Sequence, residues 1–188
     1  LAPWWASTLS AGDGVDDRRS QTAFGDFTFD TTQRQYTWQN DFTLPGDAGA
    51  LTLGIERREE RLATDAAFAV TARDTDAVFG VWRARFGDQA LQANLRRDDS
   101  SQYGGETTGA VAWGWRFAPQ WRVTAGYGTA FKAPTFNDLY YPGFSNPDLV
   151  PETSTSVEAG VYATASGDAV RVEARAIGYR NRVQRLIV

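Results

Sequence analysis

The chain has 188 residues, a formal net charge of −4, and neither cysteine nor histidine. Without these residue types it can form no disulfide, no thiolate or imidazole metal site, and no Ser-His-Asp triad. Its acidic balance argues against a nucleic-acid partner, which requires a basic face. The longest run without a charged residue is the first twelve, whereas a transmembrane helix needs about 20 apolar residues.

Alternation of apolar and polar residues is the main pattern along the chain, and this period of two is typical of strands with two unlike faces. Leu51, Leu53 and Ile55 show it first. Later runs have their apolar members at Leu91, Ala93 and Leu95; Val111, Trp113, Trp115 and Phe117; Trp121, Val123, Ala125 and Tyr127; Val157, Ala159, Val161 and Ala163; Val170, Val172 and Ala174. The stretch around Phe79 follows the pattern less clearly. We predict about nine strands.

The connections between these strands alternate in length. Short ones are predicted at 45–49, 87–89, 118–120 and 166–168. Longer ones are predicted near 13–30, 63–73, 97–106 and 132–153. Tight turns at one end and long loops at the other indicate an all-β fold, an antiparallel up-and-down meander.

The first long connection contains "GDGVDD" at 12–17, with three aspartates, Asp13, Asp16 and Asp17. Carboxylate oxygens at this spacing are candidate calcium ligands. A solvated Asp-Gly turn is the alternative interpretation.

Two all-β architectures fit the alternation. A soluble β-sandwich binding module would bury its apolar faces in a core. A transmembrane β-barrel would turn them toward lipid and fill its inside with polar residues. The mixed polar face and the unequal loops favour part of a barrel, and so do the aromatic residues around the turn at Pro119. In that interpretation "IERREERL" at 55–62 marks a strand rising out of the lipid into the lipopolysaccharide region.

The stretch from Gly126 to Ser154 breaks the alternation with four prolines and six aromatic residues. It resembles a signature of the TonB-dependent outer-membrane receptors. The matching positions are Tyr127–Pro134, Leu139-Tyr140, Asn146–Glu152 and Glu158-Ala159-Gly160. Lys132-Ala133-Pro134 should end a strand, since proline cannot donate to the ladder, and the next strand should begin at about Thr155.

Within this family the chain is most similar to the receptors for vitamin B12 (cobalamin), through 98–117, the stretch just described, and 178–187. The resemblance is continuous from about Gln33 to Val188. It implies a barrel of about 22 strands closed by an N-terminal plug. Residues 1–188 would be a middle part of that barrel, without plug or closing strands, with two open sheet edges and an end in mid-strand at Val188.

The resemblance also implies that the protein transports a nutrient and catalyses no reaction. Cobalamin or another large, scarce nutrient would bind outside the cell, and TonB would act through the plug to let it pass the outer membrane of a Gram-negative bacterium. No cofactor is expected in this chain, and calcium is a candidate in the complete receptor. A siderophore or haem receptor of the same family is the near alternative. An enzyme is not expected, because the usual catalytic histidine is absent.

The motif also supplies candidate site residues. Tyr140, Tyr141, Phe144 and Asn146 are candidates for contact with substrate, because aromatic rings suit a large, partly apolar corrin; the alternative is that they pack the loop against the rim. A second group would shape the loop or contact the plug, with a structural role as the alternative for its charged members: Lys132, Pro134, Pro147, Pro151, Glu152 and Glu158.

Overall fold

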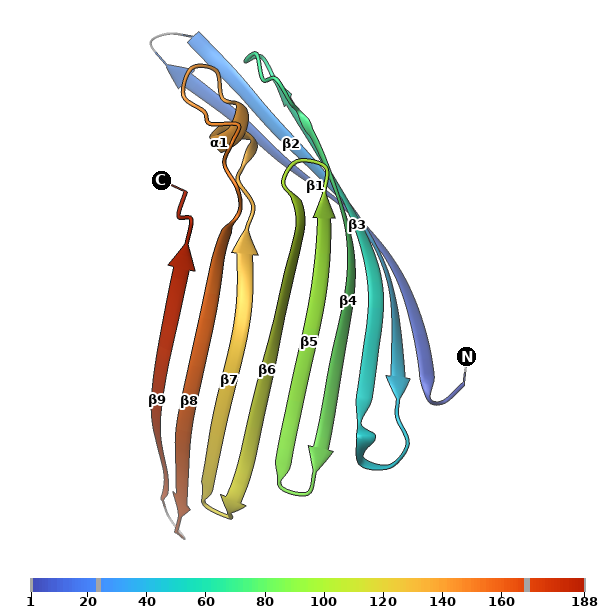
Figure 1. Cartoon of the computed structure of the whole chain (residues 1–188), viewed down its shortest axis with the longest axis vertical. Coiled ribbons are helices and arrows are strands. Elements are labelled where there is room, and N and C mark those ends of the chain that lie inside the picture. Colours follow the sequence, from blue (N-terminus) through green and yellow to red (C-terminus); the bar gives the residue numbers. More distant parts are fainter. Residues whose placement is uncertain (1, 23–24, 168–169, 188) are drawn as a thin grey trace.

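The computed structural model describes residues 2–22, 25–167 and 170–187. In these ranges the chain forms one curved antiparallel sheet whose strand order follows the chain order (Figure 1). Its strands are β1 (Trp5–Thr22), β2 (Gly25–Thr43), β3 (Ala50–Thr64), β4 (Ala72–Phe86), β5 (Gln89–Ser100), β6 (Gly104–Ala118), β7 (Trp121–Lys132), β8 (Glu152–Ser166) and β9 (Arg171–Gln184). The predicted nine-stranded meander is therefore confirmed, and β1 and β9 are its open edges.

The two ends of the sheet differ as predicted. At one end, which we call the turn end, residues 87–88 and 119–120 suffice to join neighbouring strands, and a 3₁₀ turn, η1 (Gly46–Ala48), joins β2 to β3. At the other, the loop end, 133–151 forms a long irregular loop that contains α1 (Phe136–Tyr140). In the described ranges, no helix combines the length and the apolar character needed to cross a bilayer.

Two of the predicted long connections are wrong. The segment 13–30 is a strand hairpin, because β1 continues to Thr22 and β2 begins at Gly25. Cross-strand charge pairing supports it, since Asp13 faces Arg34 in the register and binds it at 3.3 Å. The segment 97–106 likewise stays in strands except for a short turn at 101–103. Polar sequence at these places marks strands that continue into water, not loops.

Strand ends near the motif also differ slightly from prediction. β7 ends at Lys132 as expected, but β8 begins at Glu152, three residues before Thr155. β9 ends at Gln184, so the strand does not run on to the end of the chain. Val188 itself lies outside the described residues.

The sheet has an apolar face that is exposed. Leu9, Trp38, Ile55 and Val78 are neighbours across β1 to β4 in the register, and all four side chains are exposed. A sandwich would bury such a row in its core. Exposure of the apolar face is instead what a barrel wall shows where lipid surrounds it.

The opposite face is polar, and it holds the buried charges. Arg96 binds Glu56 at 2.7 Å and Asp98 at 2.8 Å, and Asp98 is almost fully buried. Phe79 lies on this face too, with its ring in the space left by Gly54. That inward aromatic residue explains why the alternation is unclear around Phe79.

Aromatic rings gather at the turn end, as expected for a girdle at a membrane interface. The ring centroids of Trp113, Trp115 and Phe117 follow one another at 6.3 and 5.6 Å, and Phe117 lies 6.5 Å from Trp121. The row crosses the turn between β6 and β7, and the register shifts there between Trp115 and Ala118.

Candidate functional site

The loop 133–151 is the most elaborate irregular segment among the described residues. Its helix α1 starts with a capping box: the Thr135 hydroxyl accepts a hydrogen bond from the Asp138 backbone N–H, and the Asp138 carboxylate accepts one from the Thr135 backbone N–H. This pattern satisfies two N–H groups that would otherwise lack partners at a helix start. Phe136 and Leu139 turn inward from the helix and are buried.

Prolines and one asparagine fix the rest of this loop. Pro134 and Pro151, at its two ends, are fully buried. The Asn146 backbone N–H donates to the Asp138 carbonyl at 2.9 Å, and the Asn146 Oδ1 accepts from the Asp148 N–H at 3.0 Å. Asn146 thus connects the later part of the loop to α1, and the loop-shaping role of the Asn-Pro motif stays a prediction.

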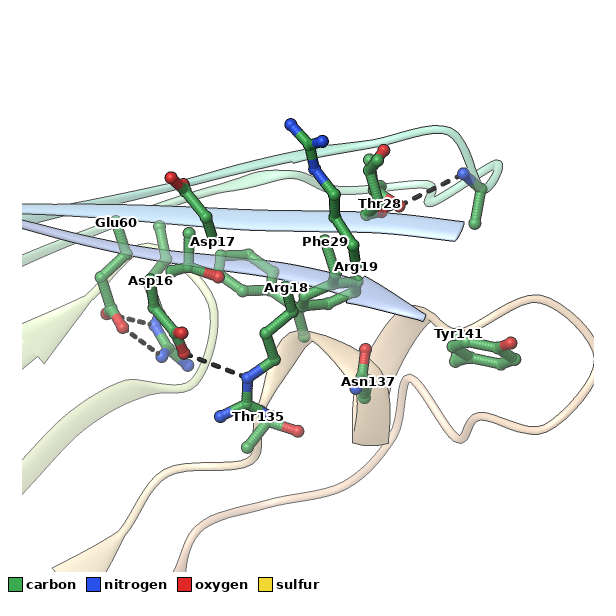
Figure 2. A pocket seen from close by; sticks show the side chains of 15 residues that line it. Asp16, Asp17, Arg18, Arg19, Thr28, Phe29, Glu60, Thr135, Asn137 and Tyr141 are labelled. Atoms are coloured by element: carbon green, nitrogen blue, oxygen red, sulfur yellow. Dashed lines mark hydrogen bonds and ion pairs between the residues drawn. The ribbon is translucent and has the colours of Figure 1, made fainter. Parts of the chain in front are cut away.

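A cavity of about 860 Å³ lies between this loop and the loop end of β1 to β3. Figure 2 shows Asp16 and Arg18 pointing toward α1, while Asp17 and Arg19 point away from it. The lining mixes aromatic with charged side chains: Asp16, Arg18, Phe29, Glu60, Arg73, Phe136 and Tyr141. Its volume falls within the range of about 300–1,000 Å³ that is usual for small-molecule sites.

The predicted substrate-loop residues occupy different positions. Tyr141 lines the cavity, and its ring meets Phe68 edge to face at a centroid distance of 5.8 Å. Phe144 is 90% exposed within the loop. Tyr140 is partly buried, and neither it nor Asn146 lines this cavity. The structure therefore brings only Tyr141 to the cavity wall.

Two residues that sequence reasoning missed connect the loop to the sheet. Phe68, in the β3–β4 connection, lies between Phe29 and Tyr141, with ring centroids 5.6 and 5.8 Å away. Arg73, at the start of β4, is 8% exposed and donates to the Pro134 carbonyl at 2.8 Å. Neither position carries a sequence signal, because 63–73 shows no clear alternation and is predicted only as a connection between strands.

The charged residues of the motif do not form one network. Lys132 and Glu152 face each other across β7 and β8, with Nζ 3.5 Å from a carboxylate oxygen. Glu152 is buried and also accepts the Ile187 backbone N–H at 2.7 Å. Glu158 lies farther along β8, opposite Gly126 and away from this pair. Glu152, the first residue of β8, therefore contacts both the end of β7 and the segment that follows β9.

The three aspartates of 12–17 lie in β1, so the solvated turn proposed for them is not formed. Asp13 and Asp17 share one face of the strand and Asp16 lies on the other. Asp13 is paired with Arg34, and Asp16 with Arg18 at 3.2 Å. Across residues 2–22, 25–167 and 170–187, no three acidic side chains are arranged to hold a metal ion. Calcium binding in the complete receptor stays a prediction.

Comparison with known proteins places this chain in a family. The family model "TonB dependent receptor-like, beta-barrel" matches residues 2–188. The chain is 33% identical over 172 residues to the vitamin B12 transporter BtuB of Vibrio cholerae, which covers 92% of this chain and 27% of the transporter. It is 34% identical over 151 residues to the BtuB of Photobacterium profundum, covering 80% of this chain and 24% of that protein.

Solved structures agree on the fold. The ferric enterobactin receptor PfeA of Pseudomonas aeruginosa, as a double mutant, superposes with a TM-score of 0.77 at 16% identity, covering 97% of this chain and 33% of that one. The siderophore receptor PirA of the same organism gives 0.69 at 19% identity, covering 96% and 42%. The chain thus spans about a quarter of the curated relatives it matches.

Proposed function

This chain belongs to the TonB-dependent receptor family, and from that premise we propose that the protein containing it takes up cobalamin or a related corrinoid. Proteins of this family are found in the outer membrane of Gram-negative bacteria. The observation that carries the proposal is the 33% identity to a vitamin B12 transporter along 92% of this chain. The likeness to siderophore receptors, at 19% identity or less, concerns the fold alone.

The cavity at the loop end has the chemistry that a corrinoid needs. A corrin ring is broad and partly apolar, and it carries polar amide groups around its rim. Phe29, Phe136 and Tyr141 offer aromatic surface, and Asp16 and Arg18 offer hydrogen-bonding groups beside it. The site is mostly open, so further loops of the complete receptor would close it over the substrate.

We also propose TonB and lipopolysaccharide as partners. TonB would act through a plug inside the barrel, against the polar face of this sheet. Lipopolysaccharide headgroups would contact the charges that follow Ile55 on the apolar face. There Arg57 binds Asp74 at 3.2 Å and Asp76 at 3.1 Å. A change from apolar to charged side chains along one face is expected where a strand leaves the lipid.

The proposal is tested with the full-length receptor in outer-membrane vesicles. Cyanocobalamin binding is measured, with haem and ferric siderophores as competitors. We expect tight binding that only corrinoids displace. Retention of a siderophore or haem in place of cyanocobalamin would keep the family and the barrel but contradict the corrinoid assignment.

Tyr141→Ala is expected to weaken cyanocobalamin binding about tenfold. The substitution removes an aromatic ring from the cavity wall, and an aromatic contact contributes about 0.5–1.5 kcal/mol beyond its buried area. Tyr141→Phe keeps the ring and its contact with Phe68, and should bind within about twofold of wild type, since little energy resides in an exposed hydroxyl. Equal affinities for all three proteins would show that substrate does not touch this wall.

A further inference from the structure

Arg73 joins more segments than any other side chain at the loop end of the described sheet. Its Nε and Nη2 donate to the two oxygens of the Glu60 carboxylate, at 2.7 and 2.8 Å. Its Nη1 donates to the Pro134 carbonyl at 2.8 Å and to the Gln102 side chain at 3.4 Å. One guanidinium therefore connects β3, β4, the β5–β6 turn and the loop 133–151.

Two aromatic rings complete its surroundings. The guanidinium carbon lies 5.2 Å from the centroid of the Phe136 ring and 5.9 Å from that of Tyr103. Both distances are within the range of about 6 Å in which a cation is attracted to an aromatic face. Since the side chain is only 10% exposed, water competes little with these contacts.

The contact with Pro134 lies at the start of the loop, between the end of β7 and the beginning of α1. β7 ends at Lys132, and α1 begins at Phe136, so Pro134 is the link between strand and helix. Its own φ is restricted by the ring, and its carbonyl is held by Arg73. Fixing Pro134 and Phe136 also fixes the start of α1, and with it the place of Tyr141 at the cavity wall.

We propose that Arg73 is a positioning residue that locks the loop 133–151 against β3 and β4 and so holds the cavity in its binding shape. Pairing with Glu60 orients the guanidinium, which leaves one edge free for the loop. A lysine could pair with Glu60 but would lack the planar set of donors that also reaches the Pro134 carbonyl. The inference rests on the proposed function only where its test measures cyanocobalamin binding; the measurement of loop mobility does not depend on it.

Arg96 provides a matched control. It also lies on the polar face and also binds two carboxylates, those of Glu56 and Asp98. Its hydrogen bonds and ion pairs among the described residues stay within β3 and β5, and none reaches the loop. Loss of Arg96 therefore removes a comparable ion pair without releasing 133–151.

The experiment measures loop mobility directly. A nitroxide spin label is attached at Phe144→Cys, a position of the loop 133–151 that is 90% exposed, in the full-length receptor with no other reactive cysteine. We expect Arg73→Met to narrow the label's central spectral line in the unliganded receptor, and Arg96→Met to leave it unchanged. Arg73→Lys should also stay mobile, because charge alone does not hold the loop.

Cyanocobalamin affinity gives the second readout. We expect Arg73→Met to bind about tenfold more weakly than wild type, and Arg96→Met to bind within about twofold. A change in gel migration between unheated and heated samples confirms that each variant has a folded barrel. If Arg73→Met does not fold, Arg73→Lys and Glu60→Gln are used for the same two measurements.

The outcomes separate the two proposals. An unchanged spectrum in folded Arg73 variants would overturn the positioning role, whatever the affinity, and so would full recovery by Arg73→Lys. The label could become more mobile in Arg73→Met while the wild-type receptor binds no corrinoid. That result would support the positioning role and reject the corrinoid function.

Discussion

Val157→Arg is expected to destabilise the folded receptor by about 2–4 kcal/mol, the cost of a cation on the lipid face of an outer-membrane barrel near the bilayer midplane. Val157 is 50% exposed on the apolar face of β8, opposite Tyr127 on the neighbouring strand. In a bilayer this exposed surface would meet acyl chains. Arginine there would have to lose its hydration or distort the lipid. In the register it would face Tyr127 on β7 and Arg180 on β9, so it would gain no acidic partner and would meet a like charge.

Ser156→Arg is the matched control for this change. Ser156 is the preceding residue, at the same height, but it is exposed on the polar face. Arginine is tolerated there where water or polar groups surround it, and we expect an effect below about 1 kcal/mol. The measurement is urea unfolding in lipid vesicles, together with the amount of receptor that reaches the outer membrane. Equal destabilisation by the two variants would contradict the assignment of the apolar face to lipid.

Gly49→Ala is the second large effect, with an expected cost of about 2–5 kcal/mol. Gly49 ends the 3₁₀ turn between β2 and β3 with φ at 84°. A side chain in left-handed backbone costs about 1–2 kcal/mol. A Cβ here would also overlap the Arg83 carbonyl oxygen of β4, and such overpacking costs typically about 1–3 kcal/mol.

The turn has little freedom to move away from β4. The Trp82 indole N–H donates to the Ala48 carbonyl at 2.8 Å, which fixes the residue just before Gly49. Gly87→Ala separates the two contributions to the cost. Gly87 also has a positive φ, 58°, but a Cβ there would meet no atom within 4 Å. Urea unfolding should show only the conformational cost for Gly87→Ala; equal values for both variants would mean that the turn relaxes.

Sequence alternation determined the sheet because a strand's side chains point to opposite faces in turn. Each run with a period of two became a strand, and the prolines around 133–151 marked where the ladder stops. The same rule could not place the ends of β1, β2 and β5. Charged residues such as Asp13 and Arg34 look like loop residues one at a time, and they are stable in strands only when the register sets them side by side.

The candidate site, too, could be predicted from the sequence only in part. The motif predicted the loop and its prolines, and Pro134 and Pro151 are indeed buried at its ends. It gave no reason to single out Arg73 or Phe68, because their partners lie far away in sequence. Arg73 reaches Pro134, 61 residues on, only because β4 and β7 belong to one curved sheet.

By itself, then, the sequence determined what depends on local chemistry: nine alternating strands, their apolar and polar faces, the tight turns, and a proline-bounded loop that resembles a receptor motif. Tertiary structure decided what depends on long-range register and curvature. It placed Tyr141 at a cavity wall and left Phe144 in solvent. It also buried Arg73 between strand and loop, because antiparallel pairing and sheet curvature bring distant residues together where no sequence spacing records it.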